Sequence, residues 1–223
     1  MVRNALRLVV GLLVYGAAPF IAAGTVAWPG AWGYLVIASI VMVVYGAIVR
    51  TRHPELIAER KKPPADAKRW DKPFVALIGG VGPVALLVVS GLDRRFGWSG
   101  PMASWVVVSG LVLAAAGGAL ANWAVAVNRF FSAVVRIQHD RGHHVVATGP
   151  YRFVRHPGYL GSTLTMTGAA LALGSWWALL TIGGLAALVV WRTALEDRTL
   201  MAELEGYTAY SERVRFRLIR GIW

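Results

Sequence analysis

Long apolar stretches, separated by short polar or glycine-containing breaks, dominate the 223-residue chain. Four of them approach or exceed the roughly 20 residues that a helix needs to cross a membrane. The last two are shorter and meet at Gly174-Ser175, which is typical of a helical hairpin. The six stretches are 6–26, 31–49, 74–92, 103–127, 159–173 and 176–191. This pattern predicts an all-α, polytopic transmembrane helix bundle of five or six spans, followed by an amphipathic cytoplasmic tail.

The polar residues divide the chain into two regions. Residues 1–128 contain four apolar spans and almost no charge within them, so they are expected to form the N-terminal transmembrane part. Residues 129–223 contain a long basic loop, the predicted hairpin and the tail. We expect this second region to hold the catalytic and cofactor-binding residues.

The formal net charge of +12 has a simple explanation in a membrane protein. Cations gather in loops that stay cytoplasmic, and RNA-binding aromatic signatures are missing, so no nucleic-acid partner is expected. The basic segments are 50–72, 129–155 and the tail from Arg192, and the weakly charged ones are 28–30, 93–101 and 174–175. Both termini are therefore predicted to be cytoplasmic, in an inner cell membrane. The chain has no cysteine, which excludes disulfides and thiolate metal ligands.

The stretch GPYRFVRHPGYLG, residues 149–161, combines breaks, tyrosines and cations between two apolar blocks. Pro157 fits the first turn of a helix, where the free N–H groups, together with Arg155 and His156, favour a carboxylate or a phosphate. Alternatively, the two cations mark the membrane boundary. Gly161 allows close approach of either a ligand or another helix.

A second polar cluster lies in RTALEDRTL, residues 192–200. Arg192, Glu196 and Glu203 share roughly one helical face, and Asp197 follows Glu196. Carboxylates at the end of a membrane helix usually mark function, although an ion pair between Arg192 and Glu196 is the simpler alternative. Glu196 is suited to an amine, a ribose hydroxyl or Arg155. A further group, His139, Asp140, His143 and His144, matches no zinc pattern, so no metal is expected.

Taken together, these motifs resemble the isoprenylcysteine carboxyl methyltransferase and phospholipid methyltransferase group. The matching pieces are His143-x-Val145-Val146-x-x-Gly149-Pro150-Tyr151, Arg155-His156-Pro157-x-Tyr159-x-Gly161, Glu196-Asp197 and Tyr207-x-x-Tyr210. The resemblance implies an integral membrane enzyme that uses S-adenosylmethionine. It places the following residues around the cofactor: His143, Gly149, Tyr151, His156, Pro157, Tyr159, Leu160, Gly161, Glu196 and Asp197.

Arg155 and Arg192, with Glu196, are the candidate catalytic residues, the two arginines orienting the methyl acceptor. The chain departs from the family at Asp197, where a second glutamate is common, and at Arg217–Arg220, where relatives often have a proline. A carboxylate acceptor needs no general base, whereas an amine or hydroxyl needs one, for which Glu196 or His156 is expected. The acceptor is expected to be lipid-like or apolar and to arrive from the bilayer.

Two other functions fit parts of the sequence. A membrane reductase of the sterol-reductase type would bind NADPH instead of S-adenosylmethionine. A non-catalytic transporter or assembly protein would carry charged residues buried in mid-span, and the first four spans have almost none. The sequence leaves the identity of the acceptor and the oligomeric state open.

Overall fold

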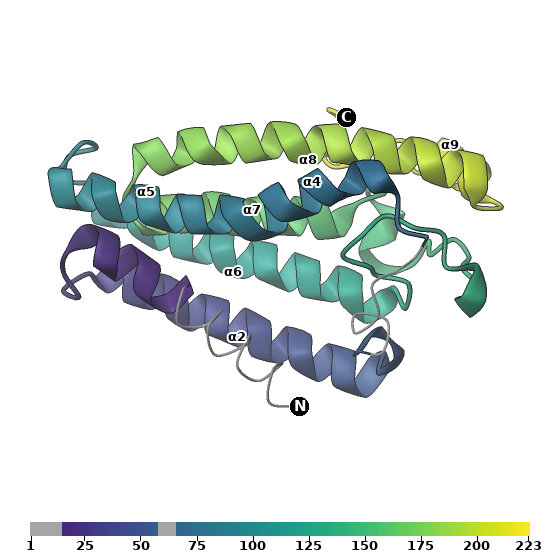
Figure 1. Ribbon diagram of the computed structural model, residues 1–223, viewed down its shortest axis with the longest axis horizontal. Helices are drawn as coiled ribbons and strands as arrows, with labels where there is room; N and C mark the ends of the chain where they lie inside the picture. The colour runs from purple at the N-terminus through teal and green to yellow at the C-terminus, as the bar shows by residue number, and fades with distance from the viewer. Residues whose placement is uncertain (1–14, 58–65) are drawn as a thin grey trace.

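The computed structural model describes residues 15–57 and 66–223, and these contain helices, turns and loops but no strand (Figure 1). The α-helices are α2 (Pro29–Arg52), α4 (Lys72–Ala76), α5 (Gly82–Phe96), α6 (Ser104–Val127), α7 (Pro157–Ala172), α8 (Trp176–Glu203) and α9 (Tyr207–Arg213). Residues 15–23 are also helical. The short turns are η1 (Arg69–Asp71), η2 (Leu77–Val81), η3 (His139–Arg141) and η4 (Gly149–Arg152). The predicted all-α fold is confirmed.

Four helical segments are long and apolar enough to cross a membrane: Pro29–Arg52, Arg69–Phe96, Ser104–Val127 and Trp176–Glu203. The second of these is continuous through a π-helical turn, η2, where the sequence has its glycine and proline breaks. At 16 residues, α7 is about 24 Å long, shorter than a hydrocarbon core of about 30 Å. Of the predicted first span, residues 6–14 lie outside the described part of the chain.

Small residues bring α6 and α7 into close contact. A Cβ atom on Gly117 would lie 2.5 Å from the Thr165 nitrogen, and one on Gly168 would lie 2.3 Å from the Ala114 nitrogen. Figure 1 shows the resulting layers, with α6 between α2 and the pair α7 and α8. Because α7 is fixed so closely to α6, the loop that leads into α7 has a defined position at one end of the bundle.

The last long helix extends beyond its apolar stretch. That stretch ends at residue 191, but α8 continues to Glu203 and contains 28 residues. The apolar pattern stops at 191 because polar side chains begin there, yet Arg192 and Asp197 are buried and paired within the fold. The helix therefore extends beyond the apolar run and carries the predicted acidic pair on its final turns.

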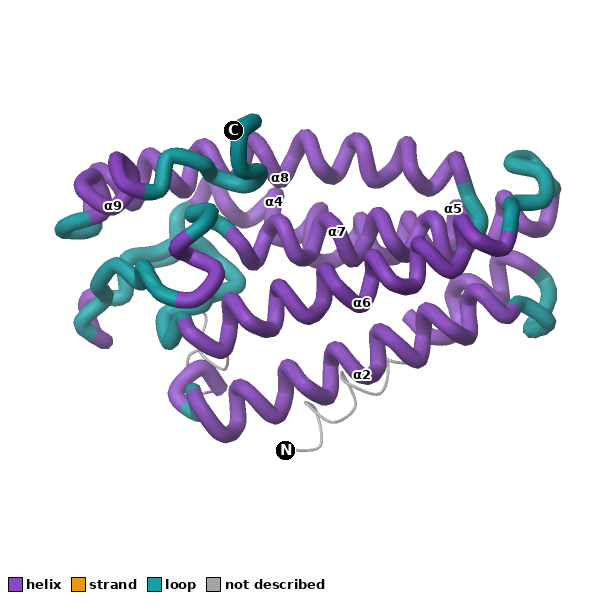
Figure 2. The backbone as a smooth tube through the Cα atoms, turned by 180° about the vertical axis from the view of Figure 1, so that it is seen from behind, coloured by secondary structure: helices purple, strands orange, loops and turns teal. Residues whose placement is uncertain are grey.

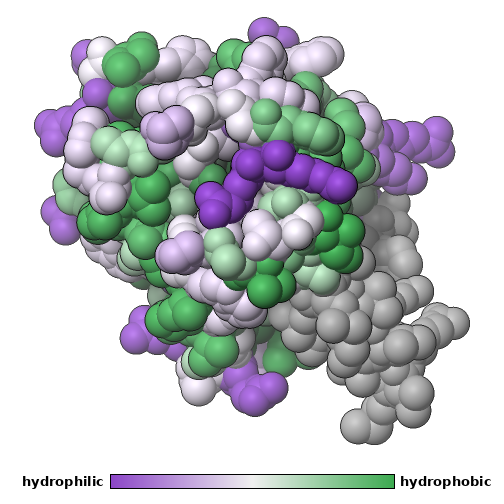
Figure 3. Space-filling model, turned by 90° about the vertical axis from the view of Figure 1, so that its left-hand side faces the viewer, coloured by the Kyte–Doolittle hydropathy of each residue, from purple (hydrophilic) through white to green (hydrophobic). Residues whose placement is uncertain are grey.

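The two ends of the bundle differ in character. One end consists of the turns around residues 24–30, 93–103 and 174–175. Its surface mixes hydrophobic and weakly polar residues, and a strongly hydrophilic strip crosses it (Figure 3). There the buried Asp93 accepts hydrogen bonds from Ser99 and Ser175 and ties two loops together. The opposite end collects the 128–156 loop, α9 and the C-terminal segment, which packs back along α8 (Figure 2).

Candidate active site

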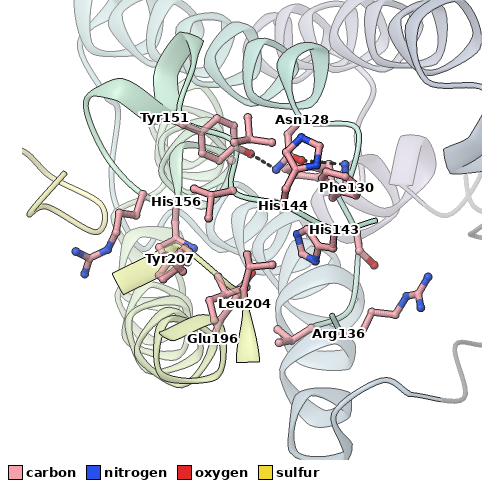
Figure 4. A pocket seen from close by; sticks show the side chains of 18 of the residues that line it. Asn128, Phe130, Arg136, His143, His144, Tyr151, His156, Glu196, Leu204 and Tyr207 are labelled. Atoms are coloured by element: carbon pink, nitrogen blue, oxygen red, sulfur yellow. Dashed lines mark hydrogen bonds between the residues drawn. The ribbon is translucent and has the colours of Figure 1, made fainter. Parts of the chain in front are cut away.

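A pocket opens at this second end of the bundle, between the 128–156 loop and the last turns of α8 (Figure 4). The volume of the pocket, including the solvent-filled space at its opening, is about 810 Å³. The lining residues are Asn128, Phe130, Phe131, Ser132, Val134, Val135, Arg136, His143, His144, Val145, Val146, Tyr151, Arg155, His156, Gly158, Tyr159, Glu196, Leu200, Leu204, Tyr207 and Tyr210. In the close view, Glu196, His156 and Tyr207 face His143 and His144 across the hollow.

Beneath this pocket, Asp197 is fully buried and accepts five hydrogen bonds. Arg155 donates two of them, at 2.9 and 2.7 Å, and Arg217 donates one at 2.8 Å. The others come from Nε2 of His156 at 3.2 Å and the hydroxyl of Tyr207 at 2.7 Å. The anion that Arg155 and His156 were expected to attract is thus, in this structure, the carboxylate of Asp197 itself.

The C-terminal segment closes over the same loop. The Arg155 N–H donates to the Phe216 carbonyl and the His156 N–H to the Arg217 carbonyl, each at 2.9 Å. The hydroxyl of Tyr210 donates to the Tyr151 carbonyl at 2.7 Å. The predicted amphipathic tail therefore packs on the site as part of the fold.

Glu196 presents the one carboxylate among the pocket-lining side chains. One of its oxygens accepts a hydrogen bond from the Tyr159 hydroxyl. Within the described ranges, no lysine, arginine or histidine lies within ion-pair distance of it. The alternative of an ion pair with Arg192 is not realised. Glu196 is half-buried and remains available to a cationic ligand.

Arg192 lies outside the pocket wall. It forms a two-pronged ion pair with the fully buried Asp71, with Nε–Oδ1 at 2.7 Å and Nη2–Oδ2 at 3.0 Å, and also donates to the Ala133 carbonyl. Its guanidinium carbon lies 5.1 Å from the centre of the Tyr159 ring. Its Nε and Nη2 are therefore engaged within the fold, and Arg192 is not among the residues that line the pocket.

His143 is held in a neutral form. Its Nδ1 accepts a hydrogen bond from the Gln138 N–H at 3.3 Å, so the ring proton of the neutral form is on Nε2. Burial, together with the positive charges of His144 and Arg136, lowers the pKa of His143 to about 4. A neutral imidazole can donate a hydrogen bond here without adding positive charge to the pocket.

The tyrosines of the pocket are held as neutral hydrogen-bonding groups. Burial raises the pKa of Tyr151 above its ordinary value, against the opposing effect of a hydrogen bond from Asn128. Burial and the negative charge of Asp197 raise the pKa of Tyr207 further. Neither hydroxyl is therefore placed to act as a base near neutral pH.

Of the residues predicted to surround a cofactor, His143, Tyr151, His156, Tyr159 and Glu196 line the pocket, and so does the candidate catalytic Arg155. The structure places the remaining predicted residues in supporting positions. They are Gly149, which begins η4 with a φ of +56°, Pro157 at the first turn of α7, Leu160 in an apolar cluster, Gly161 against α6, and Asp197 beneath the pocket.

Sequence reasoning did not name several of the lining residues. They come from residues 128–136, directly after α6, and from Leu200 and Leu204 near the end of α8. The adjacent Phe130 and Phe131, which follow the polar Asn128 at a span end, were the available signal. His139, Asp140, His143 and His144 do not form a group that would hold a metal ion.

The fold and the pocket together define a class of protein: a polytopic helical membrane protein with a pocket at one end of its bundle. Residues 105–205 match the family model for phospholipid methyltransferase. This match runs from α6 through α8 and contains every residue that the sequence predicted for the site. It confirms the predicted resemblance and indicates a membrane methyltransferase. No curated protein matches the chain.

Proposed function

We propose that this protein transfers a methyl group from S-adenosylmethionine to a lipid-like or otherwise apolar acceptor at the cytoplasmic side of an inner membrane. Glu196 carries the proposal. It is a half-buried carboxylate in an aromatic-lined pocket, without an ion-pair partner among the described residues. S-adenosylmethionine brings two cationic groups, a sulfonium and an ammonium, and one carboxylate.

The residues of the pocket fit such a ligand. The lining is rich in aromatic side chains, among them Phe130 and Tyr151, and such rings can attract a cation or stack on an adenine. His143 offers a neutral Nε2–H donor, and Glu196 an acceptor for the ammonium or the ribose hydroxyls. Arg155, held from below by Asp197, keeps positive charge at the pocket wall.

When bound, the cofactor supplies an activated methyl group, so the protein's task is to orient the acceptor and exclude water. A carboxylate acceptor needs no base. For an amine or hydroxyl acceptor, Glu196 and His156 are the candidates to take the proton, and Nδ1 of a neutral His156 is left as an acceptor because Nε2 donates to Asp197. The position at one end of a membrane bundle favours an acceptor with a polar head and an apolar tail.

The test is a titration of detergent-purified wild type and Glu196→Gln with S-adenosylmethionine and with S-adenosylhomocysteine, by calorimetry. The second ligand keeps the amino acid and the ribose but has a neutral thioether. We expect Glu196→Gln to weaken S-adenosylmethionine binding about 10- to 100-fold, because a charged partner is lost in a partly desolvated site. If Glu196 faces the sulfonium, S-adenosylhomocysteine binding changes little, whereas both ligands weaken if it faces the ammonium.

Glu203→Gln is the matched control. Glu203 is on the same helix, exposed and outside the pocket, where it pairs with Lys68. It should leave both affinities unchanged. A folded wild type that binds NADPH but neither S-adenosylmethionine nor S-adenosylhomocysteine would overturn the proposal in favour of a reductase.

A further inference from the structure

Asp71 lies in the N-terminal half of the chain, outside the segment that matches the methyltransferase family. It ends the short turn η1 at the start of the second membrane-length segment, and none of its surface is exposed. A carboxylate is costly to bury unless charged or polar groups surround it. Its partners therefore show what this buried charge holds in place.

The two oxygens of Asp71 connect α8 to the loop of residues 128–136, which lines the pocket. Oδ2 accepts the Val135 N–H at 2.8 Å, and Val135 lines the pocket. Both oxygens also bind Arg192 of α8. The backbone N–H of the nearby Lys68 donates to the Val135 carbonyl at 2.9 Å. The loop backbone at Val135 is therefore held through both its N–H and its carbonyl.

From Arg192 the contacts continue into the pocket. Its guanidinium lies over the ring of Tyr159, and the Tyr159 hydroxyl donates to Glu196. Arg192 and Glu196 are one helical turn apart on α8, so they share a face. A planar guanidinium held by two parallel hydrogen bonds has little freedom, and this fixes the ring and the carboxylate next to it.

We infer that Asp71 is a positioning residue for Glu196, the carboxylate proposed to bind the cofactor. It acts on Glu196 through Arg192 and Tyr159. It touches no ligand itself. This inference rests on the proposed function. It means that a residue of the N-terminal half, Asp71, helps to set the geometry of the site.

Asp93 provides a matched control within the same molecule. It is a second buried aspartate on the same helical segment, 2% exposed, and it binds Ser99 and Ser175. It lies 22 residues further along (93 − 71), roughly 33 Å away at 1.5 Å per residue, at the end opposite the pocket. Substituting it removes a buried carboxylate without touching the pocket.

The experiment compares S-adenosylmethionine binding by purified wild type, Asp71→Asn, Asp93→Asn, Glu196→Gln and the double variant of Asp71 and Glu196. We expect Asp71→Asn to weaken binding about 2- to 100-fold, the range of coupling within one contact network, and Asp93→Asn to leave it unchanged. In the Glu196→Gln background, Asp71→Asn should add little, because its effect passes through Glu196.

Arg192→Lys is the second variant, for use if Asp71→Asn does not fold. It keeps the charge beside Asp71 but loses the planar contact with Tyr159, so it should weaken binding too. Wild-type binding retained by both variants would overturn the inference. So would equal losses in Asp71→Asn and Asp93→Asn, or a full additional loss in the double variant. A wild type that binds no S-adenosylmethionine would instead overturn the proposed function and, with it, this inference.

Discussion

Removing the charge of Asp197 is the most direct test of how the site is held together. Asp197→Asn keeps the shape of the side chain but replaces one acceptor oxygen with an NH₂ group. That group would meet the donors of Arg155 and Arg217, or of Arg155, His156 and Tyr207, depending on how the amide turns. In either orientation, donors face a donor and a buried guanidinium loses its counter-charge.

The expected size follows from burial. Asp197 is 0% exposed and the side chain of Arg155 5%, so theirs is a fully buried ion pair. Breaking such a pair by removing one partner costs about 3–5 kcal/mol. For a chain of this length, 1 kcal/mol corresponds to about 2–4 °C, so the apparent Tm should fall by about 6–20 °C.

The assay is thermal unfolding of detergent-solubilised protein, followed by tryptophan fluorescence at one fixed scan rate because membrane-protein unfolding is commonly irreversible. Limited trypsin digestion gives a local readout, since Arg213 and Arg215 are exposed on the segment that Asp197 holds through Tyr207 and Arg217. Cleavage there should become faster in the variant than in wild type.

Glu203→Gln is again the control, because its exposed pair with Lys68 is worth about 0–1 kcal/mol. If Asp197→Asn shifted the Tm no more than this control and left the trypsin pattern unchanged, the Asp197 contacts would not hold the C-terminal segment in place. The assignment of Asp197 to a supporting position would then be wrong.

Two further predictions concern packing and pH. Gly161→Ala would place a Cβ 2.6 Å from the Ala121 nitrogen and should destabilise the protein by about 1–3 kcal/mol. Gly183 has open space around it, so Gly183→Ala should be neutral or stabilising. Comparable Tm values for the two variants would contradict the packing argument. The pKa of His143 is about 4 in the folded protein, below its ordinary value of 6.5, so the unfolded chain takes up a proton first as the pH falls. The stability contributed by the neutral ring is therefore complete above about pH 6.5 and is lost progressively as the pH falls toward 4. The fall in apparent Tm between pH 7.5 and 4.5 should therefore be smaller in His143→Gln than in wild type, and equal falls would refute the neutral, buried state of this ring.

The sequence predicted those features that depend on local patterns. Apolar length predicted the helices, and Gly161, which was expected to allow close approach of a ligand or another helix, packs against α6. The motif residues His143, Tyr159 and Glu196 do meet in one pocket. Spacing along one helix, by contrast, suggested that Arg192 pairs with Glu196. Its partner is Asp71, 121 residues away, and no local pattern indicates a contact of that separation.

The same limitation applies to Asp197, which the family resemblance placed at the cofactor together with Glu196. Successive residues on a helix point about 100° apart. One therefore faces the pocket and the other the interior, where five donors converge on it. The donors come from the loop that leads into α7, from α9 and from the C-terminal segment, and Asp71 comes from the N-terminal half. Two of these sources, the segment after residue 205 and the region around Asp71, lie outside the family match. It follows that part of what positions the pocket residues lies outside the segment that matches the family model. Substitutions of the supporting aspartates should therefore change how tightly the site is held before they change what it can bind.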